Sequence, residues 1–165
     1  LVASGIDTFS KSNYDEVRKI IQNSGIPIYI LSTGNLFYKM FEDRLGATDG
    51  IDGMPGRLTF LQAQNAMNTF AKESGGAHFP VTFQSEIPTV LQSINALLRS
   101  QYSIAYDVGE KPREAGKKFK LEVKVDVNGD GIYDEKEYVV QHRPFFVTPK
   151  EEKKKWKMRS QKSAR

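Results

Sequence analysis

Oxygen-bearing side chains recur at alternate positions in one stretch of this chain, residues 126–137. The stretch fits the pattern D-x-[DN]-x-[DN]-G-x5-E, in which glycine occupies the sixth position. Ca²⁺ takes about six to eight oxygen ligands, and this spacing wraps donors around one point while Gly131 allows the sharp turn. The predicted calcium ligands are Asp126, Asn128, Asp130, the backbone carbonyl of Ile132, Asp134 and Glu137.

The segments on either side of this stretch are typical of strands rather than of the helices of an EF-hand. Apolar residues at 119, 121, 123, 125 and 127 alternate with polar ones, and residues 138–147 are the expected hairpin partner. Asn128-Gly129 and Asp130-Gly131 are also turn pairs, which account for the glycines without a metal. Two interpretations stay open: a structural calcium loop that pins two strands together, or a hairpin turn alone.

The sequence carries no signature of catalysis. It has no cysteine, which excludes a thiol nucleophile and any thiolate metal site. It has only two histidines, His78 and His142, which lie far apart in the sequence. It contains no phosphate-binding G-x-x-x-x-G-K-[ST], no G-x-S-x-G and no H-E-x-x-H. We therefore expect no enzyme and no organic cofactor. His78 is expected to be a packed or surface residue, and Arg99 and Gln101 to fasten the end of the preceding helix to a neighbouring carboxylate or carbonyl.

The first hundred residues, which precede this hairpin, predict an α/β body. Two apolar runs without alternation, residues 1–3 and 27–32, are typical of strands buried on both faces. Between them a helical stripe at 17, 20 and 21 begins after Ser12 or Asn13 and ends at Gly25, which predicts a strand–helix–strand unit. Further helices are predicted over 36–45, 60–71 and 87–98, the last capped by Ser85, with strands over 77–83 and 102–108.

Positive charge is concentrated at one end of the chain. Residues 150–165 hold eight basic and two acidic residues, a net charge of +6, whereas the other 149 residues carry −2. Blocks of like charge are usually solvated, so we predict one domain over 1–148 and a disordered basic tail over 149–165. Trp156 is the only aromatic residue of that tail, too few for a nucleic-acid-binding segment. No apolar run approaches the roughly 18 residues that span a bilayer, so no transmembrane segment is expected.

Five segments follow one another in a recognisable order: LVASGIDT at 1–8, IPIYIL at 26–31, FAKESGG at 70–76, LLRSQY at 97–102 and GKKFKLEVKV at 116–125. Together they resemble the second half of a von Willebrand factor type A domain, over about residues 1–148. The similarity is greatest to a bacterial branch that is abundant in Acidobacteria. In that branch LRxQY marks a helix-to-strand junction, and residues 97–102 are the sharpest match.

The resemblance implies a Rossmann-like, doubly wound, mainly parallel sheet with helices on both faces, followed here by antiparallel hairpin strands. It also implies a non-enzymatic protein-interaction module of the adhesion type, which binds a protein ligand in the periplasm or outside the cell. Many members bind through a metal-ion-dependent adhesion site, made by D-x-S-x-S after the first strand, a later Thr and a fourth-strand Asp. In this chain Ser4 stands at that Asp position, Asp7 falls on the second acidic position and D-x-S-x-S is absent, so we expect no intact adhesion site.

Two other functions stay open. One is a structural or assembly domain whose incomplete sheet is completed by another segment or by a second chain, as in a homo-oligomer. The other is an α/β hydrolase-like enzyme, because this fold class hosts many chemistries. The chain starts without Met and without a signal-peptide pattern, as a processed piece would. The deciding expectation is geometric: residues 1–3 and 28–31 should lie side by side and parallel, joined by a helical crossover.

Overall fold

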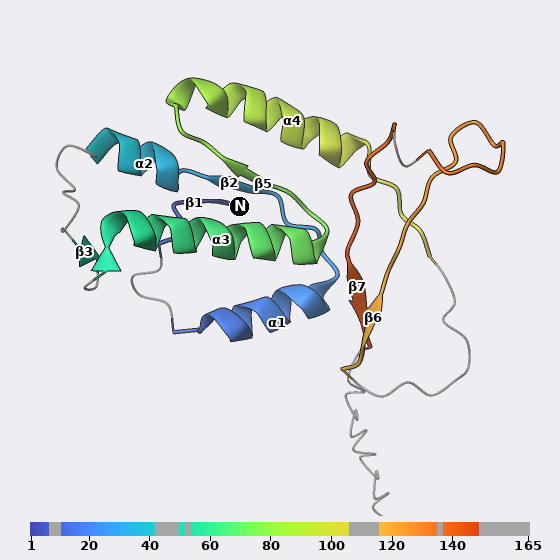
Figure 1. The fold of residues 1–165 in the computed structure, drawn as a ribbon, viewed down its shortest axis with the longest axis horizontal. Helices are drawn as coiled ribbons and strands as arrows, with labels where there is room; N and C mark the ends of the chain where they lie inside the picture. The colour runs from blue at the N-terminus through green and yellow to red at the C-terminus, as the bar shows by residue number, and fades with distance from the viewer. Residues whose placement is uncertain (7–10, 42–49, 52–53, 106–115, 135–136, 149–165) are drawn as a thin grey trace, which may run out of the picture.

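The computed structural model describes residues 1–6, 11–41, 50–51, 54–105, 116–134 and 137–148 (Figure 1). Its helices are α1 (Tyr14–Ser24), α2 (Gly34–Phe41), α3 (Gly56–Ser74) and α4 (Ile87–Arg99), with a short 3-10 helix, η1 (Gln84–Glu86), before α4. Its strands are β1 (Val2–Ala3), β2 (Ile30–Ser32), β3 (Gly50–Ile51), β4 (Met54–Pro55), β5 (His78–Pro80), β6 (Lys118–Lys120) and β7 (Phe145–Val147). The predicted basic tail lies outside the described residues.

A three-stranded parallel sheet, in the order β1-β2-β5, forms the centre of the body. Val2 in β1 lies opposite Leu31 in β2, and Ile30 in β2 lies opposite His78 in β5. Because α1 connects β1 to β2, the predicted strand–helix–strand unit with parallel strands is confirmed. β1 is an edge strand, since no other described strand pairs with its second side.

α1 begins at a capping box. Asn13 Oδ1 accepts the backbone N–H of Glu16 (2.9 Å), and Glu16 Oε2 accepts the backbone N–H of Asn13 (3.3 Å). Asn13, rather than Ser12, is therefore the cap. The helix ends at Gly25, whose φ of +72° lies in the left-handed region that favours glycine.

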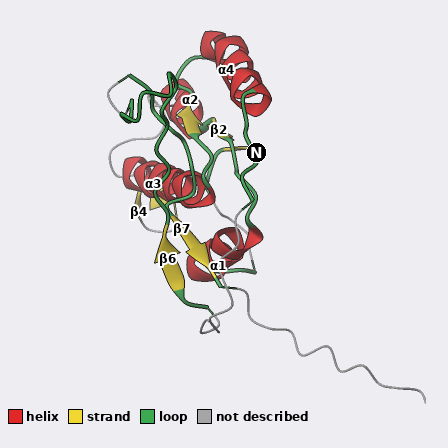
Figure 2. Cartoon of the chain, turned by 90° about the vertical axis from the view of Figure 1, so that its right-hand side faces the viewer, coloured by secondary structure: helices red, strands yellow, loops and turns green. Residues whose placement is uncertain are grey.

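The core lies between the sheet and α3, in which apolar residues recur every three or four positions. Phe60, Ala63, Met67 and Ala71 are buried, and the last two pack against the fully buried Ile30 of β2. The predicted helical face over 60–71 is therefore confirmed. α1 packs beside α3, whereas α4 lies across the sheet from α3 in both views (Figures 1 and 2).

α4 begins at Ile87, as the sequence predicts, but its cap is not the predicted one. Ser85 lies inside η1 and is not the helix cap. Glu86 instead accepts the backbone N–H groups of Phe83 (3.1 Å) and Thr82 (2.8 Å), and these hydrogen bonds hold the pKa of its carboxyl below the ordinary value. No residue of α4 is fully buried, so the predicted apolar stripe is only partly covered.

The C-terminal hairpin has a shorter ladder than predicted. β6 and β7 pair antiparallel over three residues each, with Phe119 opposite Phe146, and the N–H of Leu121 also donates to the carbonyl of Pro144 (2.9 Å). Burial alternates as predicted from 119 to 125, yet residues 122–126 and 138–142 form no assigned strand. Residues 101–105 are likewise irregular and exposed, and 106–108 lie outside the described residues. A two-stranded hairpin is marginal in water, which explains why alternation alone does not give a longer sheet.

One arginine fastens this hairpin to the helices. Arg143, just before β7, donates from Nη2 to the backbone carbonyl of Gln22 near the end of α1 (2.7 Å). Its backbone and side chain also lie against Gly75 at the end of α3, so close that a Cβ there would come within 2.8 Å of them. A cation is favoured at the C-terminal end of a helix.

Candidate functional site

The predicted calcium loop lies at the end of the hairpin farthest from β6 and β7 (orange in Figure 1). Asp126 accepts two backbone N–H groups of the loop, from Gly129 at Oδ1 (2.7 Å) and from Gly131 at Oδ2 (2.8 Å). Asp134 accepts the N–H of Val127 at Oδ2 (2.8 Å). The carboxylates at the first and ninth positions of the pattern therefore both accept backbone N–H groups of the loop, one from each end of it.

The residues at the third and fifth positions turn toward the same backbone. Asn128 Oδ1 accepts the N–H of Asp130 (3.1 Å), and Asn128 Nδ2 donates to Asp130 Oδ2 (3.0 Å). Asp130 Oδ1 accepts the N–H of Ile132 (2.7 Å). An oxygen that accepts one N–H keeps a second lone pair, so these hydrogen bonds are compatible with a bound cation.

The other two predicted ligands are less closely engaged. Glu137 is joined to the loop through its backbone N–H, which donates to the carbonyl of Asp134 (3.1 Å), and the side chain of Ile132 is exposed. Within the described ranges, which leave out 135–136, no three acidic or histidine side chains stand close enough together to hold a metal ion. The loop presents its donors in the right order, and a cation would have to draw them inward.

The two positions of the degenerate adhesion site have different outcomes. Ser4 directly follows β1, at the carboxyl end of the parallel sheet, and its Oγ accepts the N–H of Ile6 (3.4 Å). Asp7 lies outside the described residues. The carbonyl of Ser4 also approaches Gly34, where an added Cβ would lie 2.7 Å from it. The backbone of the first turn of α2 therefore passes close to the end of β1.

A polar network that the sequence did not reveal lies at the carboxyl end of β2. Ser32 Oγ lies 2.8 Å from His78 Nε2 and donates to Gln64 Oε1 (3.1 Å), whose Nε2 donates to Asn35 Oδ1 (3.4 Å). Burial lowers the pKa of His78, and Ser32 is fully buried. A serine without solvent access cannot attack a substrate, so this network is structural. His78, which was expected to be a packed or surface residue, is half-buried.

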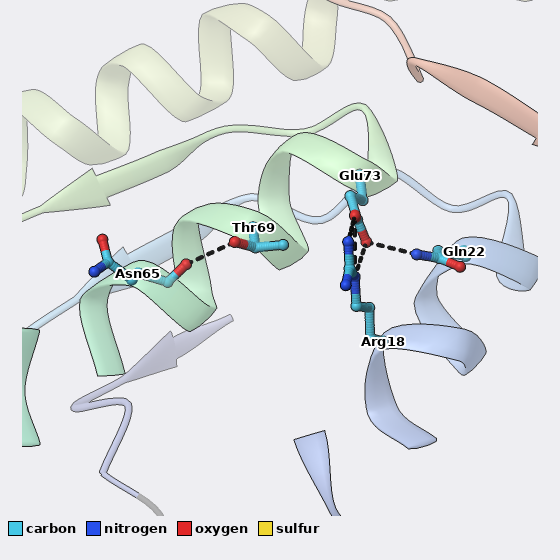
Figure 3. Close-up of polar contacts among 5 residues, drawn as sticks. All are labelled: Arg18, Gln22, Asn65, Thr69 and Glu73. Carbon is cyan, nitrogen blue, oxygen red and sulfur yellow. Dashed lines mark hydrogen bonds and ion pairs between the residues drawn. The ribbon is translucent and has the colours of Figure 1, made fainter. Parts of the chain in front are cut away.

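Polar side chains also hold the helices in place (Figure 3). Arg18 of α1 forms an ion pair with Glu73 of α3, in which Arg18 Nε donates to both carboxylate oxygens (2.9 and 3.0 Å) and Nη2 donates to Oε1. Gln22 donates a fourth hydrogen bond to Glu73 (2.8 Å). The hydrogen bonds from Arg18 hold the pKa of Glu73 below its usual value. At the end of α4, Gln101 donates to the hydroxyl of Tyr29 (3.0 Å), so it fastens the helix end as predicted, although to a phenol.

The comparisons with known proteins give no match: no family model, no curated protein and no solved structure is similar to the chain. In the part of the chain that the structure describes, no helix is both long and apolar enough to cross a bilayer.

Proposed function

We propose that this chain is a non-enzymatic protein-binding module, as its resemblance to von Willebrand factor type A domains implies, with a calcium-binding loop that stabilises its C-terminal hairpin. The observation that supports the calcium part is that the side chains of Asp126, Asn128, Asp130 and Asp134 all accept backbone N–H groups of one turn. The parallel pair of β1 and β2, joined through α1, supports the module part because the resemblance requires that arrangement.

The cation has a structural role in this proposal. Carboxylates crowded into one loop repel one another, and a divalent cation removes that repulsion. It would also hold residues 122–126 close to residues 138–142, neither of which forms a regular strand. Because the loop is open to solvent, we expect a weak site, in the range of about 0.1–1 mM that is typical of extracellular modules. Such a site suits the periplasmic or secreted location that the resemblance implies.

Calorimetric titration with Ca²⁺ tests the calcium part. We expect one saturable site with a Kd of about 1 mM or below. Asp126→Asn should weaken binding at least about tenfold, because the first ligand loses its charge while the side chain keeps its shape. Glu122→Gln, which removes an exposed carboxylate outside the loop, should leave the affinity unchanged. The absence of binding at millimolar Ca²⁺, or equal weakening by the two substitutions, would contradict this part.

A second candidate is the assembly domain, and one observation favours it. Leu1 and Val2 are 69% and 67% exposed, whereas Leu31, in the adjacent strand, is 2% exposed. An exposed edge strand with apolar side chains is a template for pairing with another strand. By contrast, the hydrolase-like alternative gains no support from the fully buried Ser32.

A further inference from the structure

We infer that the chain docks on membranes of anionic lipid through a basic surface made by two parts of the sequence. One part is Lys117, Lys118 and Lys120, in and just before β6, and the other is residues 150–165, which carry a net charge of +6. These two parts are called here the basic surface. Docking of this kind needs neither the calcium loop nor a protein ligand.

Hydrogen bonds fix the point from which the basic segment 150–165 continues. The N–H of Thr148 donates to the carbonyl of Lys117 (3.0 Å), and the N–H of Lys117 donates to Thr148 Oγ1 (3.0 Å). Thr148 is buried, although Lys117 lies 31 positions earlier in the sequence. Residue 150 follows Thr148 by two positions, and two residues span at most about 7 Å. The charge of the segment therefore begins within a Debye length of this junction, about 10 Å at 0.1 M salt.

The lysines of β6 are on the outside of the hairpin. Lys118 and Lys120 are exposed, whereas Phe119 between them is half-buried. Because side chains alternate along a strand, the two lysines share its solvent-facing side. Lys117 is exposed as well. The structure thus adds three accessible cations at the place where the segment of net charge +6 follows β7, which makes a net charge of +9 for the basic surface.

Acidic side chains of the hairpin do not cancel this charge. Glu122, two positions after Lys120, forms an ion pair with Lys124 (3.3 Å). The carboxylates of the candidate calcium loop lie at the end of the hairpin farthest from β6 and β7 (Figure 1). The hairpin therefore has a positive end and a negative end, and an anionic surface would orient the chain with the loop held away from it.

The type of basic residue favours a lipid surface over a nucleic acid. All three cations of the described part are lysines, and six of the eight basic residues of 150–165 are lysines. The lysine ammonium is a compact, hydrated point charge, which suits diffuse attraction to a charged plane. Arginine, whose planar group binds phosphate through two hydrogen bonds, is the residue favoured in nucleic-acid recognition.

The aromatic residues point to the same choice. Proteins that bind single-stranded nucleic acid stack bases on aromatic rings. In the hairpin, Lys118 Nζ lies 4.7 Å over the ring centre of Phe145, and Lys117 Nζ lies 5.9 Å over that of Phe119, so lysines occupy faces that bases would need. Trp156, within the basic segment, is of the residue type that is enriched at membrane interfaces, where one end of its ring is apolar and the other wet.

Co-sedimentation of the 165-residue chain with vesicles, in EDTA and 0.1 M salt, tests the inference. We expect binding to phosphatidylcholine vesicles that contain about 30% phosphatidylserine, no binding to phosphatidylcholine alone, and release at about 0.5 M salt. Lys120→Gln should weaken binding on the order of fivefold, the contribution of one basic residue near an anionic surface. Lys39→Gln, on an exposed position of α2 far from the hairpin (Figures 1 and 2), should leave binding unchanged.

A tail variant separates the basic surface from its C-terminal part alone. Replacement of Lys153, Lys154 and Lys155 by Gln should weaken binding on the order of a hundredfold. Circular dichroism melts show whether each variant is folded. Loss of binding in the tail variant without any in Lys120→Gln would overturn the composite surface, and so would equal binding to the two kinds of vesicle. Because EDTA removes Ca²⁺, none of these results depends on the calcium loop.

Trp156 is the single tryptophan of the chain, so its fluorescence reports on the basic segment. Its emission should shift to shorter wavelength with anionic vesicles, because the indole leaves water for the membrane interface. Single-stranded and duplex DNA at the same salt concentration provide the competing polyanion. Tighter binding to DNA than to anionic vesicles, or an unshifted emission on those vesicles, would overturn the choice of a lipid surface.

Discussion

Among single residues, Glu73 has the densest set of polar contacts described, with hydrogen bonds from both Arg18 and Gln22. It lies on α3, and both of its partners lie on α1, so these contacts set how the two helices meet. The side chain of Glu73 is 12% exposed and that of Arg18 is 39% exposed. Water therefore screens the pair in part, and its contribution to stability is modest.

Glu73→Gln should lower the free energy of unfolding at pH 7 by about 0.5–1 kcal/mol. Because the folded-state pKa of Glu73 is lowered, its stabilisation is fully present above the unfolded-state pKa, near 4.5, and is lost as the pH falls through the folded-state pKa. Urea denaturation at a series of pH values measures this. The acid slope should be shallower in Glu73→Gln than in the wild type, and unaltered in Glu122→Gln, whose pair with Lys124 is on the surface. Equal slopes in all three proteins would refute this role.

Hydrogen bonds between side chains and their partners could be predicted from local residue patterns only where the two lie close together in the sequence. The oxygen donors of the hairpin loop could be read from their spacing, because each bonds to backbone within a few residues. The network of Ser32 and His78 could not, since its members are 46 positions apart and meet only when β2 and β5 align. A serine directly after an apolar run at the carboxyl end of a parallel strand was the one available signal.

At the scale of elements, the predictions succeeded where local signals agree with burial. The capping box, the left-handed Gly25 and the unalternating strands together determine β1, α1 and β2. The lengths of the hairpin strands were overestimated. An alternating pattern indicates which side chains are buried, but it does not indicate whether a neighbouring strand supplies hydrogen bonds. The burial pattern from 119 to 125 was right, and the length of the ladder was wrong.

Two glycines, one between α3 and β5 and one in the hairpin loop, separate the effect of steric space from that of backbone conformation. A Cβ on Gly76, between α3 and β5, would lie 2.0 Å from the carbonyl oxygen of Ile28. Gly129 has a φ of +76° but open space around it. We expect Gly76→Ala to cost about 3 kcal/mol or more, because backbone atoms must move. Gly129→Ala should cost about 1 kcal/mol, from the left-handed conformation alone. Chemical denaturation measures both, and a larger loss at Gly129 would contradict this reasoning.

At the scale of the whole molecule, Arg143 joins the α/β body to the hairpin that carries the candidate calcium loop. Arg143→Met removes the charged hydrogen bond to the carbonyl of Gln22 while keeping much of the volume. We expect a loss of about 1.5–3 kcal/mol, because that carbonyl loses a charged donor. Lys120→Met, an exposed cation on the same hairpin, should change stability by less than about 0.5 kcal/mol. Thermal unfolding compares the two, and equal losses would contradict an anchoring role for Arg143.

The same contact affects how the chain can mature on the ribosome. Gln22 and Arg143 are 121 positions apart, whereas β1, α1 and β2 are all made within the first 32 residues. At about 5–20 residues per second, the end of α1 waits roughly 6–24 s for its partner to be synthesised. Until then its final carbonyls face water or a chaperone. The body can therefore begin to assemble early, but the end of α1 gains its last partner only after residue 143 has emerged.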